Sequence, residues 1–161
     1  MKHLSGVAAA TYLSSQDWSG RVLEVGTGCG LLAGVLHDRG AQVTAVDVST
    51  HAVACARSNL SATSVDVRQS DLFAAVVGES FDTVVVNPPY EVGRSWSRNL
   101  RSADMLPRLA EQWADHALRL VMMFPTDSAD ILDAAGFDVG CVERIATSGR
   151  ELGIYTATAE Q

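Results

Sequence analysis

Residues 87–90 read Asn-Pro-Pro-Tyr and place two hydrogen-bond acceptors and an aromatic ring directly after a run of three valines. Asn87 offers its side-chain oxygen, and Pro88 leaves a carbonyl available where the chain can no longer continue a sheet. Tyr90 adds a flat aromatic face. These groups suit a planar –NH2 group, because two acceptors bind both N–H bonds and turn the nitrogen lone pair toward an incoming group. We therefore interpret Asn87, Pro88 and Tyr90 as candidate catalytic residues; the alternative is a rigid loop that ends a buried strand.

A glycine-rich turn at residues 24–30, Glu-Val-Gly-Thr-Gly-Cys-Gly, follows one predicted strand and opens a predicted helix. Glycines let a ligand approach the backbone closely, and the N-terminus of a helix offers unpaired N–H groups. The even spacing of these glycines differs from the G-x-G-x-x-G of a dinucleotide site, which disfavours a nicotinamide cofactor, and no lysine follows as in a P-loop. The alternative is a tight turn without a ligand. The candidate ligand-binding residues are Glu24, Gly26, Thr27, Gly28 and Gly30.

Two aspartates end the next two predicted strands. Asp47, followed by Val48, comes about twenty residues after the glycine turn, where a carboxylate can accept hydrogen bonds from both hydroxyls of a ribose. Asp71, followed by Leu72, is positioned to bind an adenine amino group and to cover the ring. Each aspartate alone is more often a helix cap or turn residue. Ligand-type residues at three successive strand ends favour a bound nucleoside over capping.

The elements that must position these residues alternate between short β-branched runs and helical stretches. This alternation predicts an α/β, Rossmann-like fold: a mostly parallel seven-stranded sheet with one antiparallel edge strand and helices on both faces. In such sheets ligands bind beyond the carboxyl ends of the strands. We expect one domain over residues 1–161. The predicted strands are residues 21–26, 42–48, 65–69, 81–87, 119–124, 137–145 and 151–157, and the predicted helices are about 30–38, 49–60, 106–117 and 127–135.

The net charge of −7 and the pI near 4.9 argue against broad binding to a phosphate backbone by this chain alone. They do not exclude a nucleic acid brought in by a partner. Four arginines follow the Asn-Pro-Pro-Tyr segment at positions 94, 98, 101 and 108. We interpret them as solvated loop charges, with an acidic protein or a few phosphates as the alternative.

No apolar run approaches the roughly 20 residues that span a bilayer, and no signal peptide is visible, so we expect a cytoplasmic protein without a membrane segment. Cys29, Cys55 and Cys141 are odd in number and far apart, and no histidines have metal-binding spacing. We therefore expect three half-buried thiols and no metal site.

With these motifs the sequence resembles the class I methyltransferases of the HemK-like group, which carry an E-x-G-x-G-x-G turn and an N-P-P-Y motif. The resemblance runs from about Ala10 almost to the C-terminus and includes residues 148–152, Ser-Gly-Arg-Glu-Leu. That ending and the short chain most resemble the compact eukaryotic and archaeal branch that methylates release factors. Members of this branch work with a small zinc-binding activator subunit, so the resemblance implies such a partner.

The resemblance implies S-adenosyl-L-methionine as the cofactor and gives each motif residue a role. Glu24 and Gly26 would hold the methionyl end, Asp47 the ribose, and Asp71 and Leu72 the adenine. Asn87 would bind the substrate nitrogen next to the cofactor. Thr11 matches the threonine of an E-D-T-[YF] segment that touches the cofactor in that branch, although Ala9 and Ala10 replace its acidic pair.

The implied activity is N-methylation of a planar amide or amino nitrogen. We expect a glutamine side-chain amide in a protein, in particular the Gly-Gly-Gln loop of a release factor, as the substrate. The first alternative is the exocyclic nitrogen of adenine in RNA or DNA, since both groups present –NH2 beside a planar π-system. The second alternative, from another class, is a non-catalytic scaffold that binds only the cofactor; residues 87–90 argue against it, because binding alone would not need them.

Overall fold

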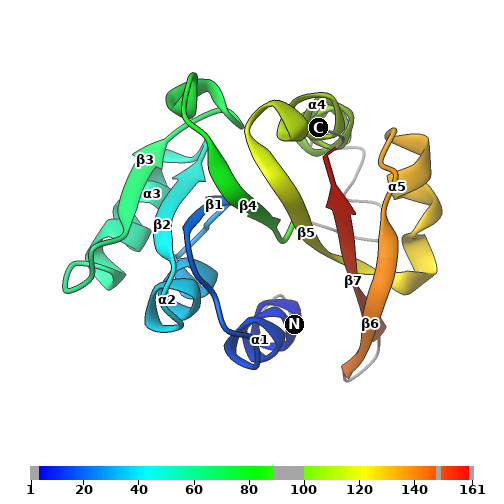
Figure 1. The fold of residues 1–161 in the computed structure, drawn as a ribbon, viewed down its shortest axis with the longest axis horizontal. Coiled ribbons are helices and arrows are strands. Elements are labelled where there is room, and N and C mark those ends of the chain that lie inside the picture. Colours follow the sequence, from blue (N-terminus) through cyan, green and yellow to red (C-terminus); the bar gives the residue numbers. More distant parts are fainter. Residues whose placement is uncertain (1–3, 89–99, 148–149, 160–161) are drawn as a thin grey trace.

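The computed structural model describes residues 4–88, 100–147 and 150–159, which form a single sheet with helices on both faces (Figure 1). The seven strands of the described residues follow the order β3-β2-β1-β4-β5-β7-β6. Strands β1 to β5 are parallel to one another, and β7 is antiparallel to both β5 and β6. The predicted fold class is confirmed, with the antiparallel hairpin at one edge of the sheet. The strands are β1 (Arg21–Val25), β2 (Gln42–Asp47), β3 (Asp66–Gln69), β4 (Phe81–Val86), β5 (Ala117–Pro125), β6 (Gly140–Thr147) and β7 (Arg150–Thr158).

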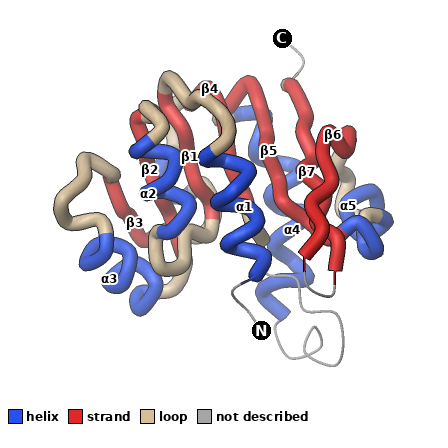
Figure 2. Tube along the Cα trace, turned by 90° about the horizontal axis from the view of Figure 1, so that it is seen from below, coloured by secondary structure: helices blue, strands red, loops and turns tan. Residues whose placement is uncertain are grey.

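Two apolar clusters, one on each face, hold the helices to the sheet (Figures 1 and 2). Helices α1 (Leu4–Ser14), α2 (Leu31–Asp38) and α3 (Thr50–Asn59) cover one face, and Leu13, Leu36 and Ala56 are completely buried there. Helices α4 (Leu100–Gln112) and α5 (Asp130–Ala134) cover the other, together with the short 3-10 helix η1 (Ala74–Val76). None of the described helices is long and apolar enough to cross a membrane.

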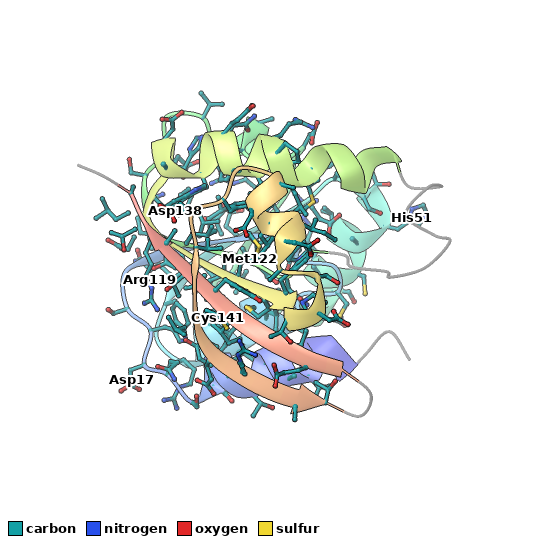
Figure 3. All side chains as sticks on the ribbon, turned by 90° about the vertical axis from the view of Figure 1, so that its right-hand side faces the viewer. Asp17, His51, Arg119, Met122, Asp138 and Cys141 are labelled. Carbon is teal, nitrogen blue, oxygen red and sulfur yellow. The ribbon has the colours of Figure 1, made fainter. Side chains whose placement is uncertain are left out.

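The central strands are buried on both faces, as the valine run of β4 predicts. Val84, Val85 and Val86 have no exposed surface, and neither does Met122 in the neighbouring β5. Figure 3 labels Met122 among the side chains around the sheet. Continuous apolar runs are typical of parallel strands covered by helices on both sides. The edge strand β6 is instead largely exposed, and Cys141 lies on it. The prediction of half-buried thiols is wrong, because Cys29, Cys55 and Cys141 are all exposed.

Three predicted elements differ most from the structure in their bounds, and one helix was not predicted. Ala117, predicted on a helix, begins β5, because it pairs with Phe81 in the sheet after α4 has ended and a 3-10 turn, Trp113–Asp115, has followed. The predicted helix at 127–135 is shorter and begins as a 3-10 turn, Thr126–Ser128. The strand predicted from residue 137 begins at Gly140, since Phe137 packs into the core instead. Helix α1 was not predicted, although its sequence is rich in alanine and leucine.

Candidate active site

The sheet register brings the predicted site residues to one edge. Val25 of β1 pairs with Val46 of β2 and with Val86 of β4. The residues that follow these three, Gly26, Asp47 and Asn87, therefore lie side by side at the carboxyl ends of adjacent strands. Asp71 follows β3, one strand further out. With neighbouring strands about 4.8 Å apart, the ends of β3 and β4 are separated by about 14 Å along this edge. Such a span suits an elongated ligand that lies across several strands.

The three glycines of the turn have different physical roles. Gly26 and Gly28 have φ values of 80° and 57°, and a Cβ atom on either would meet no atom within 4 Å. Both positions therefore face open space, where a ligand can approach the backbone. A Cβ atom on Gly30 would lie 2.7 Å from Leu60 Cδ1 and 3.3 Å from Ala56 Cβ. The missing side chain of Gly30 is explained by packing against α3, and its predicted cofactor contact stays a prediction.

Glu24 is buried and turned inward. Thr27 Oγ1 donates a 2.6 Å hydrogen bond to Glu24 Oε2, and the backbone N–H of Ala33 also donates to this carboxylate. Burial raises the pKa of Glu24 from 4.5 to about 7, although the hydrogen bonds from Thr27 and Ala33 oppose that change. These contacts join the strand end, the glycine turn and the beginning of α2. The contacts described for Glu24 and Thr27 fix the turn, and their predicted binding to the methionyl end is not tested by them.

Asp47 is held by two backbone donors. Its Oδ2 accepts a 2.9 Å hydrogen bond from Gly28 N, and its Oδ1 accepts a 2.8 Å hydrogen bond from Ser49 N. A carboxylate oxygen has two lone pairs, so each oxygen keeps capacity for a further donor such as a ribose hydroxyl. The neighbouring Val48 is about half exposed (48%) and offers an apolar surface at this edge. These contacts leave Asp47 free to accept from a ligand, and the predicted cofactor contacts of Asp47 and Val48 stay predictions.

The turn after β3 is fixed by a residue that the sequence did not single out. Ser70 is buried. Its hydroxyl donates a 2.7 Å hydrogen bond to Leu72 O and accepts a 2.9 Å hydrogen bond from Ala75 N. Leu72 has a φ of 50°, a left-handed conformation that is uncommon for a residue with a side chain. Its side chain is buried in the core cluster that includes Val46 and Phe73. Leu72 therefore closes the core beneath this edge.

Asn87 carries the most informative polar atom of the site. Asn87 Oδ1 is buried and is the only such side-chain oxygen or nitrogen in the described residues without a hydrogen-bond partner. Leaving a buried polar group unpaired costs on the order of 1–3 kcal/mol. A buried acceptor without an internal partner, at the end of a strand beside the glycine turn, is suited to a donor that arrives with a ligand. Pro88 is buried beside it, and Tyr90 lies outside the described residues.

Thr11 and Arg108 lie on helices rather than at the end of a strand. Thr11 lies on α1 with an exposed side chain, and its hydroxyl donates to Val7 O at 2.9 Å within the same helix, so nothing described ties it to this edge. Arg108, interpreted from sequence as a solvated charge, instead lies on α4 and pairs with Asp71. No signal short of the fold itself could have found this pairing of residues 37 positions apart.

The charges at this edge are acidic near the strand ends. Asp47 ends β2 and Asp71 follows β3, with Arg108 as the described counter-charge of Asp71, whereas the buried Glu24 lies inside β1. An acidic edge with open glycines, sugar-type acceptors and an exposed valine suits a cationic nucleoside better than a phosphate-rich one. Among the described residues, no group of three or more His, Cys, Asp and Glu could hold a metal ion.

An α/β sheet with a glycine turn and a row of acceptors at its carboxyl edge defines a Rossmann-like nucleoside-binding domain. Residues 8–136 match the family model described as the methyltransferase small domain, and the chain belongs to that family.

Comparison with curated relatives points to two kinds of methyltransferase. The chain is 37% identical over 136 residues to a release factor glutamine methyltransferase of Chlorobaculum tepidum, covering 78% of this chain and 42% of that protein. It is 33% identical over 150 residues to the ribosomal RNA small subunit methyltransferase C of Yersinia enterocolitica, covering 89% of this chain and 41% of that protein. The chain spans less than half the length of these relatives.

Solved structures share the fold. A 16S rRNA N2 G1207 methyltransferase of T. thermophilus in complex with AdoMet and guanosine has a TM-score of 0.72 at 21% identity, covering 97% of this chain and 42% of that one. A ribosomal protein L11 methylase of Lactobacillus delbrueckii subsp. bulgaricus also has a TM-score of 0.72 at 21% identity, covering 94% of this chain and 78% of that one. At this identity the similarity establishes the fold.

Proposed function

We propose that this chain is an S-adenosyl-L-methionine-dependent N-methyltransferase domain that acts on a planar –NH2 group. The observation that carries the proposal is the buried, unpaired Oδ1 of Asn87 beside an open glycine turn. A domain that only bound the cofactor would have no use for an unpaired buried acceptor next to it, which disfavours the scaffold alternative. Membership of the methyltransferase small domain family supports the reaction class.

The residues fit the cofactor from its adenosyl end to its methionyl end. Asp47 would accept from the ribose hydroxyls, Val48 would support the ring, and Asp71 would accept from the adenine amino group. Gly26 and Gly28 leave room for the methionyl part, and the acidic edge would compensate its positive charge. When bound, this cofactor supplies a methyl group activated by a sulfonium centre.

The protein's own contribution is orientation of the nitrogen. An amide or aryl –NH2 nitrogen is a poor nucleophile because its lone pair is delocalised into the π-system. Hydrogen bonds from its two N–H groups to Asn87 Oδ1 and to the Pro88 carbonyl would direct the lone pair away from both acceptors and stabilise positive charge that develops on the nitrogen. No strong base is required, since the N–H proton becomes acidic as the new bond forms.

The substrate we propose is a glutamine side-chain amide in a protein, such as a release factor. The release factor glutamine methyltransferase relatives support this choice, as does the net charge of −7, which does not favour unaided binding to RNA. The second candidate is an exocyclic amino group of a nucleobase in RNA. It is supported by the relatives named ribosomal RNA small subunit methyltransferase C and by the fold of the guanosine-bound neighbour. The activator subunit stays a prediction from resemblance.

Transfer of labelled methyl groups from S-adenosyl-L-methionine tests both candidates. The purified chain is incubated with a release factor that carries the Gly-Gly-Gln loop, with small ribosomal subunits, with deproteinised 16S rRNA and with adenine-containing oligonucleotides. The first candidate is supported if the release factor becomes labelled and if this label is lost when the glutamine of its loop is replaced by alanine. Label on guanine or adenine alone, at every salt concentration, would replace it with the second.

A further inference from the structure

The carboxylate of Asp71 is bonded by an arginine of α4, Arg108. Arg108 Nη1 donates to Asp71 Oδ1 at 3.2 Å, and Arg108 Nη2 donates to Asp71 Oδ2 at 3.1 Å. Two parallel hydrogen bonds of this kind fix the plane of a carboxylate as well as its charge. The two side chains remain partly open to solvent, with exposed fractions of 44% and 57%.

Hydrogen bonds within the turn fix the backbone around Asp71, but they do not fix the Asp71 side chain. Ser70 N donates to Asp47 O at 2.9 Å, which joins this turn to the end of β2. The Ser70 hydroxyl then bonds both Leu72 O and Ala75 N. The carboxylate of Asp71 projects from this rigid turn into solvent, and its described partner is Arg108. Without that partner, an exposed carboxylate would sample several rotamers.

Helix α4 does not need this ion pair for its attachment. Leu106 and Leu109 of α4 are 3% and 0% exposed, and both pack in the core cluster below the helix. Partly exposed ion pairs contribute little to folding stability. The bidentate geometry is therefore better explained by what it does for Asp71 than by what it does for α4.

We propose that Arg108 is a positioning residue that orients the Asp71 carboxylate toward the amino edge of the cofactor's purine, so that the site selects adenine over hypoxanthine. The inference rests on the proposed function, in which Asp71 accepts from the adenine amino group. Each carboxylate oxygen that bonds Arg108 keeps a second lone pair for that amino group. Hypoxanthine carries an oxygen at the same position, which cannot donate and faces the carboxylate unfavourably.

The experiment measures the affinities of S-adenosylhomocysteine and of S-inosylhomocysteine by calorimetry. The variants are Arg108→Met, which keeps an unbranched apolar stem, Asp71→Asn, and their combination. The matched control is Arg39→Met, since Arg39 also forms an ion pair, with Asp17 at 2.8 Å, but lies next to the amino end of β2 rather than its carboxyl end. Thermal unfolding of every variant is recorded in parallel.

The unaltered protein and Arg39→Met are expected to prefer the adenosyl ligand by about tenfold to a hundredfold, the ratio for one hydrogen bond to a charged group. Arg108→Met is expected to reduce this preference to about threefold or less while the melting temperature stays within about 2 °C. Adding Asp71→Asn to Arg108→Met should then change the preference little, because the two residues act as one unit.

Two results would overturn the assignment. One is an unchanged adenosyl preference in Arg108→Met, including the case in which that variant loses affinity equally for both ligands, and the other is no preference in the unaltered protein. In each case S-adenosylhomocysteine still binds the unaltered protein, so the proposed function survives. Absence of any S-adenosylhomocysteine binding to the unaltered protein would instead refute the proposed function, and the role of Arg108 with it.

Discussion

Glu24 should make the stability of the protein depend on pH in an unusual direction. Because burial raises the pKa of Glu24 from 4.5 to about 7, the folded protein keeps a proton between these pH values that the unfolded chain has released. The free energy of unfolding contributed by this group is therefore fully present below pH 4.5, falls as the pH rises toward 7, and is constant above. Structural carboxylates that accept hydrogen bonds usually act in the opposite direction, gaining stability as the pH rises.

The size of the effect follows from the two pKa values. A difference of about 2.5 pH units, at about 1.36 kcal/mol per unit, gives a loss of about 3 kcal/mol of unfolding free energy between pH 4.5 and pH 8. The substitution Glu24→Gln removes the titration and keeps an oxygen that can accept from Thr27 or from the Ala33 N–H. Between pH 4.5 and pH 8, the free energy of unfolding of the variant should therefore rise by about 3 kcal/mol relative to that of the unaltered protein. This change does not depend on how stable the variant is at pH 4.5.

Urea unfolding followed by circular dichroism at five pH values from 4.5 to 8.5 measures this difference. Taking the difference between the two proteins cancels the titration of the histidines and the other acidic residues. Glu111→Gln on the exposed side of α4 is the matched control and should run parallel to the unaltered protein. A difference for Glu24→Gln that stays constant within about 1 kcal/mol over the whole range would refute the reasoning.

Two other substitutions test the site, and a pair of glycine substitutions tests the packing of the turn. Asn87→Ala is expected to lower turnover about a hundredfold or more with cofactor affinity preserved, because the amide oxygen orients the acceptor nitrogen; near-normal turnover would remove Asn87 from the mechanism. Asp47→Ala should weaken calorimetric binding of S-adenosylhomocysteine by about 1.5–3 kcal/mol, the cost of a lost charged hydrogen bond, and unchanged affinity would contradict the ribose assignment. Gly30→Ala should cost about 1 kcal/mol or more of stability beyond Gly28→Ala, since only the former places a Cβ against Leu60; equal losses in urea unfolding would contradict the packing role of Gly30.

The sheet and its edge could be predicted from sequence because each rests on a local pattern. The valines of β4 predict a strand that is buried on both faces. The glycine turn follows β1 and Asp47 ends β2, and right-handed crossovers constrain the order of such strands in a parallel sheet. Boundaries were less accurate where long-range contacts decide them. Ala117 continues the apolar spacing of α4, yet pairing with Phe81 places it in β5, because the backbone hydrogen bonds of a sheet outweigh intrinsic helical propensity, even that of alanine.

The direction in which a side chain points was the part least accessible from sequence. Nothing in the motif at residues 24–30 distinguishes the inward-facing Glu24 from a residue that faces a ligand, or the packed Gly30 from the open Gly28. The pairing of Arg108 with Asp71 joins residues from α4 and the end of β3, and only the packing of that helix brings them together. Ser70 was missed because a buried serine in a turn has no distinctive sequence signal.

The role proposed for Asn87 would explain why relatives of this chain are named for both protein and RNA substrates. A neutral amide oxygen and a backbone carbonyl recognise two N–H bonds on a planar nitrogen, and glutamine, guanine and adenine all present that pattern. Acceptors of this kind cannot discriminate among the three, so discrimination must come from surfaces around the reacting nitrogen. For the described part of the chain those surfaces are acidic at the strand ends, and the chain spans less than half the length of relatives named for either substrate. Whole release factors and ribosomal subunits, rather than isolated glutamine or nucleosides, are therefore the substrates on which selectivity must be measured.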